Sequence, residues 1–248
     1  MTLRAVLRLA VNRVLAPLGV EIVRSARLHR HFQDSGDGRL QAALQRQRVE
    51  LVIDIGANVG QFALDLLRHG YGGHIISVEP LPDAHAKLRE AAAAHARWTV
   101  ADAMALGPCK GLVKLQVAGN SVSSSVLPML DRHVEAAPES RGAGVVQVRQ
   151  DTADEVFAEQ VAASRTLIKI DTQGYEREVL QGASRCLDRA KLVFMELSVV
   201  PLYEGQWLWL EAIRFMQERG YELVFLQPDF TDPRTGQVLQ YNGLFQRA

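Results

Sequence analysis

Short apolar runs alternate with amphipathic stretches along most of the chain, and this alternation predicts β-α-β units. We expect strands at 51–55, 74–79 and 98–101, separated by helices at 61–69 and 83–95. Gly70 follows the first of these helices, and Pro80 and Pro82 mark the turn after the second strand. Because crossovers between parallel strands are right-handed, the pattern predicts the first half of a doubly wound, Rossmann-like sheet.

The second half of the chain repeats this alternation after an interruption. In the middle, short strands at 111–117 and 145–148 flank a Ser-rich loop and a stretch, 131–144, that begins as a helix. Thr152 then begins a capping box for a helix to about residue 163. The remaining predictions are strands at 166–171 and 191–197, helices at 175–181 and 208–219, and two final strands at 221–227 and 238–247. Their short connection predicts antiparallel pairing of the last two strands.

The first 49 residues are predicted to be an extension that precedes a single domain at 50–248. In the segment 2–18, Leu3, Leu7 and Val11 share one helical stripe and Arg4 lies beside it. Such a basic amphipathic helix can bind an anionic membrane surface peripherally. The alternative is a helix that packs on the domain or on a second copy in a homodimer. No apolar run reaches the roughly 18 residues that a membrane span needs.

Composition narrows the class of protein further. The formal net charge is zero, so no overall charge attracts nucleic acid. Cys109 and Cys186 are isolated, which is typical of a reduced compartment and not of a disulfide framework. No cleavable signal is apparent in the first residues. We therefore expect a cytoplasmic protein, with membrane contact at the inner face as the peripheral alternative.

The first predicted strand leads into a glycine turn, Gly56-Ala-Asn-Val-Gly60, at the start of a helix. Such a turn allows backbone N–H groups to approach a ligand closely. A dinucleotide-binding turn requires G-x-G-x-x-G, but Asn58 and Gln61 occupy the positions of its second and third glycines. A pyrophosphate is therefore disfavoured, and no G-x-x-x-x-G-K-[ST] loop supports ATP or GTP.

Acids accompany three successive strands around this turn, which suits S-adenosylmethionine, a ligand without phosphate. Asp54 lies in the first strand, Glu79 ends the second and Asp102 follows the third. A carboxylate at position 79 is suited to accept hydrogen bonds from both ribose hydroxyls, and Asp102 from the adenine amino group. Hydrogen bonds to charged acceptors contribute about 1.5–3 kcal/mol each. The alternative for any one of these acids is to cap the following helix.

Several segments resemble the FkbM family of S-adenosylmethionine-dependent methyltransferases from about residue 50 to the C-terminus. The first, Val-Ile-Asp-Ile-Gly-Ala-Asn-Val-Gly (52–60), fits many methyltransferases, whereas Ile-Lys-Ile-Asp-Thr-Gln-Gly-Tyr-Glu (168–176) is far more specific. The others are Val-Glu-Pro-Leu-Pro (78–82), Ala-Leu-Gly (105–107), Ser-Ser (123–124), Val-Leu-Gln-Gly-Ala (179–183), Met-Glu-Leu (195–197) and Leu-Tyr-Glu-Gly-Gln (202–206). Asn242 departs from the pattern, because an acid is expected before the final Leu-Phe.

This resemblance implies a seven-stranded, mostly parallel sheet and O-methylation of a hydroxyl, often on a sugar or polyketide product. It also implies that Gly56, Glu79 and Asp102 lie near the cofactor. The full set of expected cofactor-binding residues is Asp54, Gly56, Ala57, Asn58, Gly60, Glu79, Pro80, Asp102 and Ala103.

Three acids in the second half are the candidates for catalysis. Asp171 ends the strand expected beside the first one, and we predict it to be the general base, with a metal ligand as the alternative. Related sugar methyltransferases carry paired acids here, whereas this chain has Thr172 and Gln173, so a divalent metal is not favoured. Glu176 is second, with stabilisation of its helix N-terminus as the alternative, and Glu196 is suited to bind the acceptor hydroxyl.

Substrate binding is expected in two segments, with Asn120, Ser123 and Ser124 in one and Tyr203 and Trp207 in the other. An aromatic ring can stack on a sugar, or it can pack in the core instead. The sequence therefore predicts an O-methyltransferase for a sugar, glycan, glycolipid or related natural product. The alternatives are a methyltransferase for a non-sugar small molecule and a binding module that retains the cofactor without turnover.

Overall fold

The computed structural model describes residues 35–248, so the predicted helix at 2–18 lies outside the described residues. The chain divides into two compact units, Met1–Ala42 and Ala43–Ala248, and helix α3 (Gly36–Arg46) begins in the first and ends in the second. Among the described helices, none combines the length and apolar character needed to cross a membrane. The site described below belongs to the second unit.

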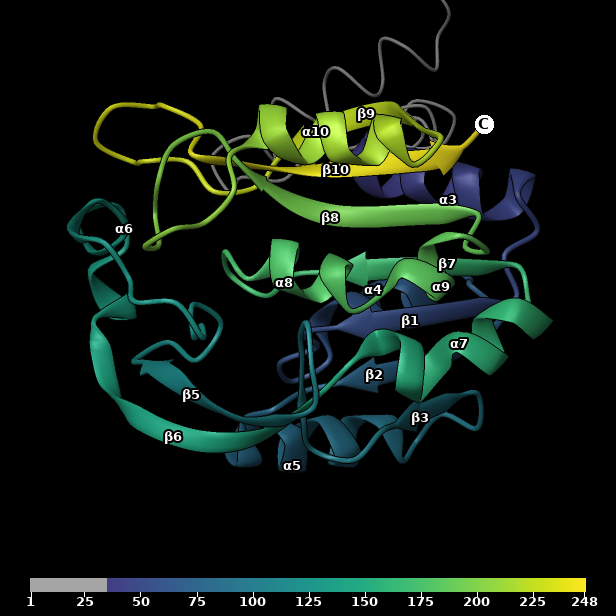
Figure 1. Ribbon diagram of the computed structural model, residues 1–248, viewed down its shortest axis with the longest axis horizontal. Coiled ribbons are helices and arrows are strands. Elements are labelled where there is room, and N and C mark those ends of the chain that lie inside the picture. Colours follow the sequence, from purple (N-terminus) through teal and green to yellow (C-terminus); the bar gives the residue numbers. More distant parts are fainter. Residues whose placement is uncertain (1–34) are drawn as a thin grey trace, which may run out of the picture. The chain divides into compact units, whose positions relative to one another are not determined.

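The second unit contains a seven-stranded sheet with the order β3-β2-β1-β7-β8-β10-β9 (Figure 1). The pairs formed by β1 with β2 and β7, β2 with β3, and β7 with β8 are parallel, whereas β10 runs antiparallel to both β8 and β9. The strands are β1 (Leu51–Ile55), β2 (His74–Val78), β3 (Trp98–Val100), β7 (Thr166–Ile170), β8 (Leu192–Ser198), β9 (Tyr221–Pro228) and β10 (Gln240–Arg247). This is the predicted doubly wound α/β fold, with antiparallel pairing of the last two strands confirmed.

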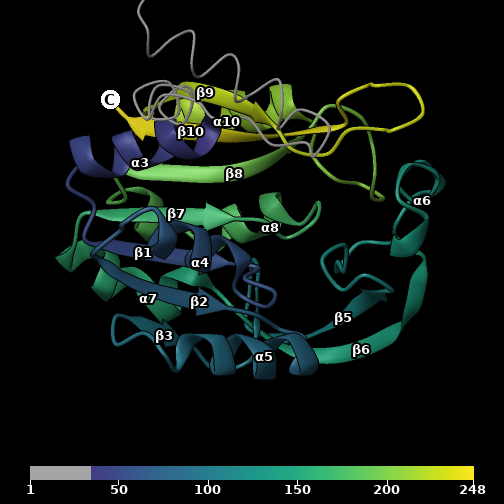
Figure 2. The same ribbon diagram turned by 180° about the vertical axis from the view of Figure 1, so that it is seen from behind.

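Helices cover both faces of this sheet (Figures 1 and 2). Helices α4 (Gln61–Arg68) and α5 (Pro82–Ala92) lie on one face. The other face carries α7 (Ala153–Ala163), α8 (Glu176–Gln181), α9 (Ser184–Leu187) and α10 (Trp209–Glu218). One half of the predicted capping box of α7 is present, because Thr152 Oγ1 accepts a hydrogen bond from the backbone N–H of Glu155 at 3.1 Å. The Thr152 N–H donates to Asp151 instead of Glu155.

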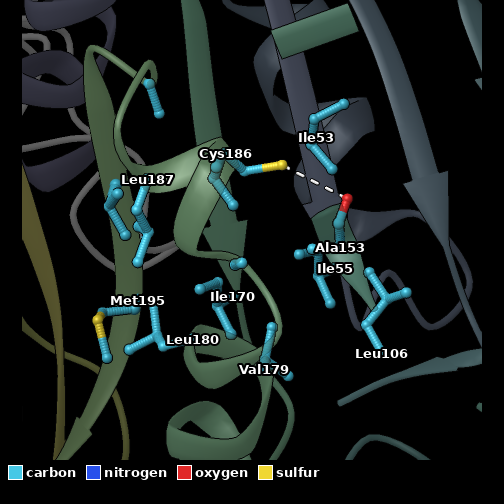
Figure 3. Close-up of a cluster of buried hydrophobic side chains, with 14 of the residues drawn as sticks. Ile53, Ile55, Leu106, Ala153, Ile170, Val179, Leu180, Cys186, Leu187 and Met195 are labelled. Carbon is cyan, nitrogen blue, oxygen red and sulfur yellow. Dashed lines mark hydrogen bonds between the residues drawn. The ribbon is translucent and has the colours of Figure 1, made fainter. Parts of the chain in front are cut away.

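The main core lies between the central strands and helices α7–α10. Figure 3 shows Ile53, Ile170 and Met195 of the sheet beside Val179 and Leu187 of the helices. Each fully buried aliphatic side chain of this size contributes about 1.5–3 kcal/mol. The thiol of Cys186 donates to the backbone carbonyl of Ala153 at 3.4 Å, which joins α9 to the start of α7 (Figure 3).

A second sheet of three strands interrupts the α/β alternation, with the order β4-β6-β5. It consists of β4 (Ala105–Leu106), β5 (Gly111–Ala118) and β6 (Gly142–Asp151), and β5 and β6 pair antiparallel. The stretch 131–144 begins with helix α6 (Asp131–Ala136), as predicted, and continues through the 3-10 turn Pro138–Ser140 into β6. Strand β6 is longer than predicted, because pairing with β5 extends through two glycines that have low strand propensity. The β5–β6 pair projects beyond the carboxyl ends of β1 and β7 (Figure 1).

Candidate active site

A cavity of about 260 Å³ lies at the carboxyl ends of β1, β2 and β7. The strand order reverses between β1 and β7, and ligands of open α/β sheets bind at this position. Its walls come from the glycine turn, the end of β2, the segment after β5 and the end of β7. The polar groups among the lining residues are Asn58, Gln61, Glu79, Ser121, Ser124, Lys169, Asp171, Thr172, Gln173, Tyr175 and Asn242.

Gly56 lines the cavity, and any side chain at this position would also collide with the end of the neighbouring strand β7. Its φ is +73°, and a Cβ atom at this position would lie 1.8 Å from the backbone carbonyl oxygen of Asp171. Gly60 has a φ of +95°, and a Cβ there would lie 2.5 Å from the ring of Trp98. The sequence predicts a glycine turn because of ligand approach. The structure adds that the turn packs directly against β7 and β3.

Glu79 and Pro80 line the cavity at the end of β2. The Glu79 carboxylate is buried, and its two oxygens accept hydrogen bonds from the backbone N–H groups of Asn58 and Leu81, both at 2.8 Å. Burial raises the pKa of Glu79, and these two hydrogen bonds oppose that effect. Because a carboxylate has about four acceptor positions, two remain for a ligand.

Asp54 lies beneath the glycine turn and does not line the cavity. Its side chain is 0% exposed, and one oxygen lies 3.1 Å from the Lys169 ammonium. The Ser77 hydroxyl donates to the other oxygen at 3.0 Å. Lys169 also donates to the backbone carbonyl of Gly56 at 2.8 Å. Asp54 therefore supports the turn from below through Lys169, and its direct contact with a cofactor stays a prediction.

Lys169 connects Asp54 to the end of β7. Its ammonium lies 3.5 Å from Asp171 Oδ2. Burial alone lowers the pKa of Lys169, but the carboxylates of Asp54 and Asp171 outweigh it and raise the pKa above its usual value. Lys169 is therefore a permanent buried cation beside the turn.

Asp171 is the one predicted catalytic acid that lines the cavity. Its side chain is 39% exposed, and the amide nitrogen of Gln173 donates to its Oδ1 at 2.9 Å. Lys169 is close to the other oxygen, so both oxygens have a protein partner while the carboxylate still faces the cavity. A group placed in this way can accept a proton from a bound hydroxyl.

Glu176 supports the turn that follows β7 and does not line the cavity. Its Oε1 accepts hydrogen bonds from the backbone N–H groups of Thr172 and Gly174, at 2.9 and 3.2 Å. Burial, together with the negative charge of Asp171, raises the pKa of Glu176 to about 7. Both bonds go to residues that precede α8, so Glu176 holds the turn between β7 and this helix, and its catalytic role stays a prediction.

Glu196 is also buried outside the cavity. Gln173 Nε2 donates to its two oxygens at 3.2 and 3.3 Å. Burial raises the pKa of Glu196 well above its usual value, and the charges of Asp171, Glu176 and Asp229 add to this. Gln173 thus lies between Glu196 and the cavity-facing Asp171, and a contact of Glu196 with an acceptor hydroxyl stays a prediction.

Asp102 and Ala103 lie at the surface and outside the cavity. The Asp102 side chain is 85% exposed, and its nearest cationic partner is Arg149 at 3.9 Å. The buried side chain of Met104 forms the cavity wall at this point instead. The structure thus exposes the Asp102 carboxylate to water next to the cavity wall, and its contact with the adenine stays a prediction.

The predicted substrate-binding residues of the Ser-rich loop separate into two groups. Ser124 lines the cavity together with Ser121 and Val122. Asn120 and Ser123 do not line it and bond to each other: Asn120 Nδ2 donates to Ser123 Oγ at 3.0 Å, and Asn120 Oδ1 accepts from the Ser123 N–H at 3.2 Å. These two residues therefore shape the loop.

The aromatic residues predicted to bind substrate lie outside the cavity. Tyr203 is buried, and its hydroxyl lies 2.8 Å from Gln173 Oε1 and 2.9 Å from the carbonyl oxygen of Ser123. Trp207 packs edge-on against Phe215, with 5.0 Å between ring centroids, and beneath the guanidinium of Arg177. The Tyr203 ring packs against His133 of α6, with 5.3 Å between ring centroids, and the Trp207 ring packs against α10. Both rings thus have packing partners, and their contact with a substrate stays a prediction.

Four residues that line the same cavity as Asp171 were not predicted from the sequence as site residues: Phe62, Gln173, Phe194 and Asn242. Phe62 and Phe194 stack with centroids 5.9 Å apart, although their sequence signal is only that of apolar core positions. Asn242 Nδ2 donates to Asp229 at 2.8 Å. An acid therefore lies near the position where the family pattern expects one, but it comes from a different element.

No group of three or more His, Cys, Asp or Glu side chains suited to hold a metal ion occurs within residues 35–248.

A family profile matches the part of the chain that forms most of the cavity. The profile described as "Methyltransferase FkbM domain" matches residues 54–223, which include the glycine turn, Glu79 and Asp171. The chain belongs to the FkbM methyltransferase family. A relative among characterised proteins is the 2-O-methyltransferase NoeI of Sinorhizobium fredii (strain NBRC 101917 / NGR234). It is 27% identical over 169 residues, which are 66% of this chain and 69% of the relative.

Solved structures of other methyltransferases resemble this FkbM protein in outline. Magnesium protoporphyrin IX methyltransferase of Synechocystis PCC 6803, solved with bound SAM, has a TM-score of 0.46 and 11% identity. The alignment covers 100% of this chain and 98% of that chain. Precorrin-6y C5,15-methyltransferase of Geobacter metallireducens GS-15 has a TM-score of 0.42 and 13% identity, with coverages of 84% and 88%.

Proposed function

We propose that this FkbM protein is an S-adenosylmethionine-dependent O-methyltransferase that acts on a hydroxyl of a sugar or glycan-like acceptor. The observation that carries the proposal is the Asp171 carboxylate, which faces the cavity while Lys169 and Gln173 hold its two oxygens. The family membership supports methyl transfer. The relative NoeI is a 2-O-methyltransferase, which supports oxygen as the acceptor atom.

The cavity has features that fit the cofactor. Glu79 keeps two acceptor positions beyond its bonds to Asn58 and Leu81, as two ribose hydroxyls require. Gly56 lines the cavity without a side chain, where a Cβ would also meet the Asp171 carbonyl. Met104 and Leu106 add apolar surface suited to a flat ring. When bound, S-adenosylmethionine supplies a methyl group that its sulfonium already activates.

Asp171 accepts the proton in this proposal. The acceptor oxygen forms a bond to the methyl carbon, the carbon–sulfur bond breaks, and the hydroxyl proton moves to the Asp171 carboxylate. A sugar hydroxyl is weakly acidic, so a positioned base adds about 10²–10⁴-fold to the acceleration that alignment provides. Lys169 keeps the carboxylate oriented through its ion pair.

Calorimetry with S-adenosylhomocysteine tests the cofactor site. We expect Glu79→Gln to weaken binding by about 10- to 150-fold, because each hydrogen bond to a charged acceptor contributes about 1.5–3 kcal/mol. Glu90→Gln removes one carboxylate from an exposed position of α5 and is the matched control. Absence of binding by the wild-type protein, or equal binding by the Glu79 variant, overturns the assignment.

Mass spectrometry of glycans tests the acceptor class. Glycans from cells that lack the protein should be lighter by about 14 daltons, the mass that one methyl group adds. Incubation with the purified protein and S-adenosylmethionine should restore this mass. Asp171→Asn should lower the rate of restoration at least about 10²-fold while S-adenosylhomocysteine still binds. If Asp171→Asn retains activity within a few-fold of wild type, Asp171 is not the general base. Cofactor binding without transfer to any glycan favours the binding module or a non-sugar acceptor.

A further inference from the structure

Gln173 has an unusual backbone for a residue with a side chain. Its φ is +56°, in the left-handed region that L residues seldom adopt. A hydrogen bond from another segment stabilises this backbone conformation: the Ser125 hydroxyl donates to the Gln173 carbonyl oxygen at 2.7 Å. Such outliers concentrate at functional sites, where the surrounding structure keeps them in place. The unusual φ of Gln173 therefore indicates that its side chain has a function.

The Gln173 amide joins three side chains from different elements. Its nitrogen donates to Asp171 Oδ1 at 2.9 Å and to Glu196 Oε1 at 3.2 Å. Its oxygen accepts from the Tyr203 hydroxyl at 2.8 Å. The opposite amide orientation would direct a carbonyl oxygen at two carboxylates and lose both donors. The two N–H groups of one amide thus match the two carboxylates, while the amide oxygen and the Ser123 carbonyl oxygen share the Tyr203 hydroxyl.

The surroundings of this amide are rich in negative charge. Four carboxylates interact there electrostatically, and the buried ammonium of Lys169 lies 3.5 Å from one of them, Asp171. They come from the end of β7, from α8, from β8 and from the segment between β9 and β10, and they are Asp171, Glu176, Glu196 and Asp229. Two carboxylates that meet directly tend to share one proton, as in aspartic proteases. Such sharing would occupy the base.

We propose that Gln173 is a positioning residue for Asp171: its amide holds the Asp171 carboxylate toward the cavity and separates it from Glu196, so that the two acids do not share a proton. This inference rests on the proposed role of Asp171 as the base. Lys169 on Oδ2 and Gln173 on Oδ1 then fix the plane of the carboxylate. The remaining acceptor positions of Asp171 face the cavity that this side chain lines.

Two substitutions separate the contributions of the amide. Gln173→Met keeps the length of the side chain and removes both donors. Gln173→Glu keeps its size and replaces the donor nitrogen with a further acceptor oxygen. Gln147→Glu introduces the same charge at an exposed position of β6 and is the matched control. If the Met variant does not fold, the nearly isosteric Glu variant provides the test alone.

The measurement is a carbon-13 NMR titration of the full chain labelled at Asp and Glu carboxyl carbons. We expect the acid cluster as a whole to bind its protons about 1 to 2 pH units higher in Gln173→Met than in wild type, because a hydrogen bond to charged carboxylates is lost. Gln173→Glu should show an additional protonated carboxyl at neutral pH. In Gln147→Glu the added group should titrate near its usual value of about 4.3.

The outcomes distinguish this inference from the function on which it rests. The role of Gln173 is overturned if the titration curves of the acid cluster in both variants superimpose on the wild-type curve. In Gln173→Glu this comparison leaves out the introduced carboxyl, if that group titrates at its ordinary pKa. A purely structural side chain would lower the melting temperature but leave the titration of the cluster unchanged. The titration needs neither cofactor nor acceptor. A wild-type protein that fails to bind S-adenosylhomocysteine therefore refutes the proposed function by a separate measurement.

Discussion

Replacing Lys169 with Met should destabilise the protein strongly, because it leaves Asp54 as a buried charge without a cation. The Asp54 carboxylate is 0% exposed and lies 3.1 Å from the Lys169 ammonium. Among the described residues it retains only the Ser77 hydroxyl as a hydrogen-bond donor after the change. Removing one partner of a buried ion pair costs about 3–5 kcal/mol. Asp171, the other partner, is 39% exposed and regains water, so most of the cost comes from Asp54.

The size of this effect can be measured by urea unfolding at pH 7, followed by circular dichroism. The double variant Asp54→Asn with Lys169→Met removes both charges, and we expect it to recover at least about half of the lost free energy of unfolding. Lys114→Met, at an exposed position of β5, should change the free energy by no more than about 0.5 kcal/mol. A loss below about 1 kcal/mol in the single variant, or no recovery in the double variant, would refute the reasoning.

Three further changes test other parts of the structure. The pKa of Glu176 is raised to about 7, so the folded state holds a proton that the unfolded chain releases near pH 4.5. Stability should therefore fall by about 3 kcal/mol as the pH rises from 4.5 to 7, and Glu176→Gln should flatten that dependence in urea titrations. Gly56→Ala should abolish S-adenosylhomocysteine binding or folding, because its Cβ would meet the Asp171 carbonyl at 1.8 Å; calorimetric binding within threefold of wild type would contradict this. Thr152→Ala should lower the free energy of unfolding by about 1 kcal/mol through loss of the α7 cap, and an unchanged urea midpoint would argue against the cap.

Much of the fold could be predicted from the sequence because its signals are local. Apolar runs indicated the buried strands β1, β2, β7 and β8, and their boundaries agree with the structure to within one or two residues. Thr152 indicated the start of α7, and Gly56 and Gly60 indicated the turn. The length of β6 was underestimated, because its pairing with β5 depends on a partner strand and not on its own glycine-containing sequence.

The sequence by itself determined which acids lie near strand ends, and it placed Glu79 and Asp171 at the correct edge of the sheet. Only the tertiary structure decided which of the acids face the cavity. Glu196 is turned away because Gln173, 23 positions earlier in the chain, lies between it and Asp171, and Asp102 is exposed because the chain turns outward after β3. Side-chain direction at a strand end depends on packing between elements that are distant in sequence, and periodicity carries no information about it.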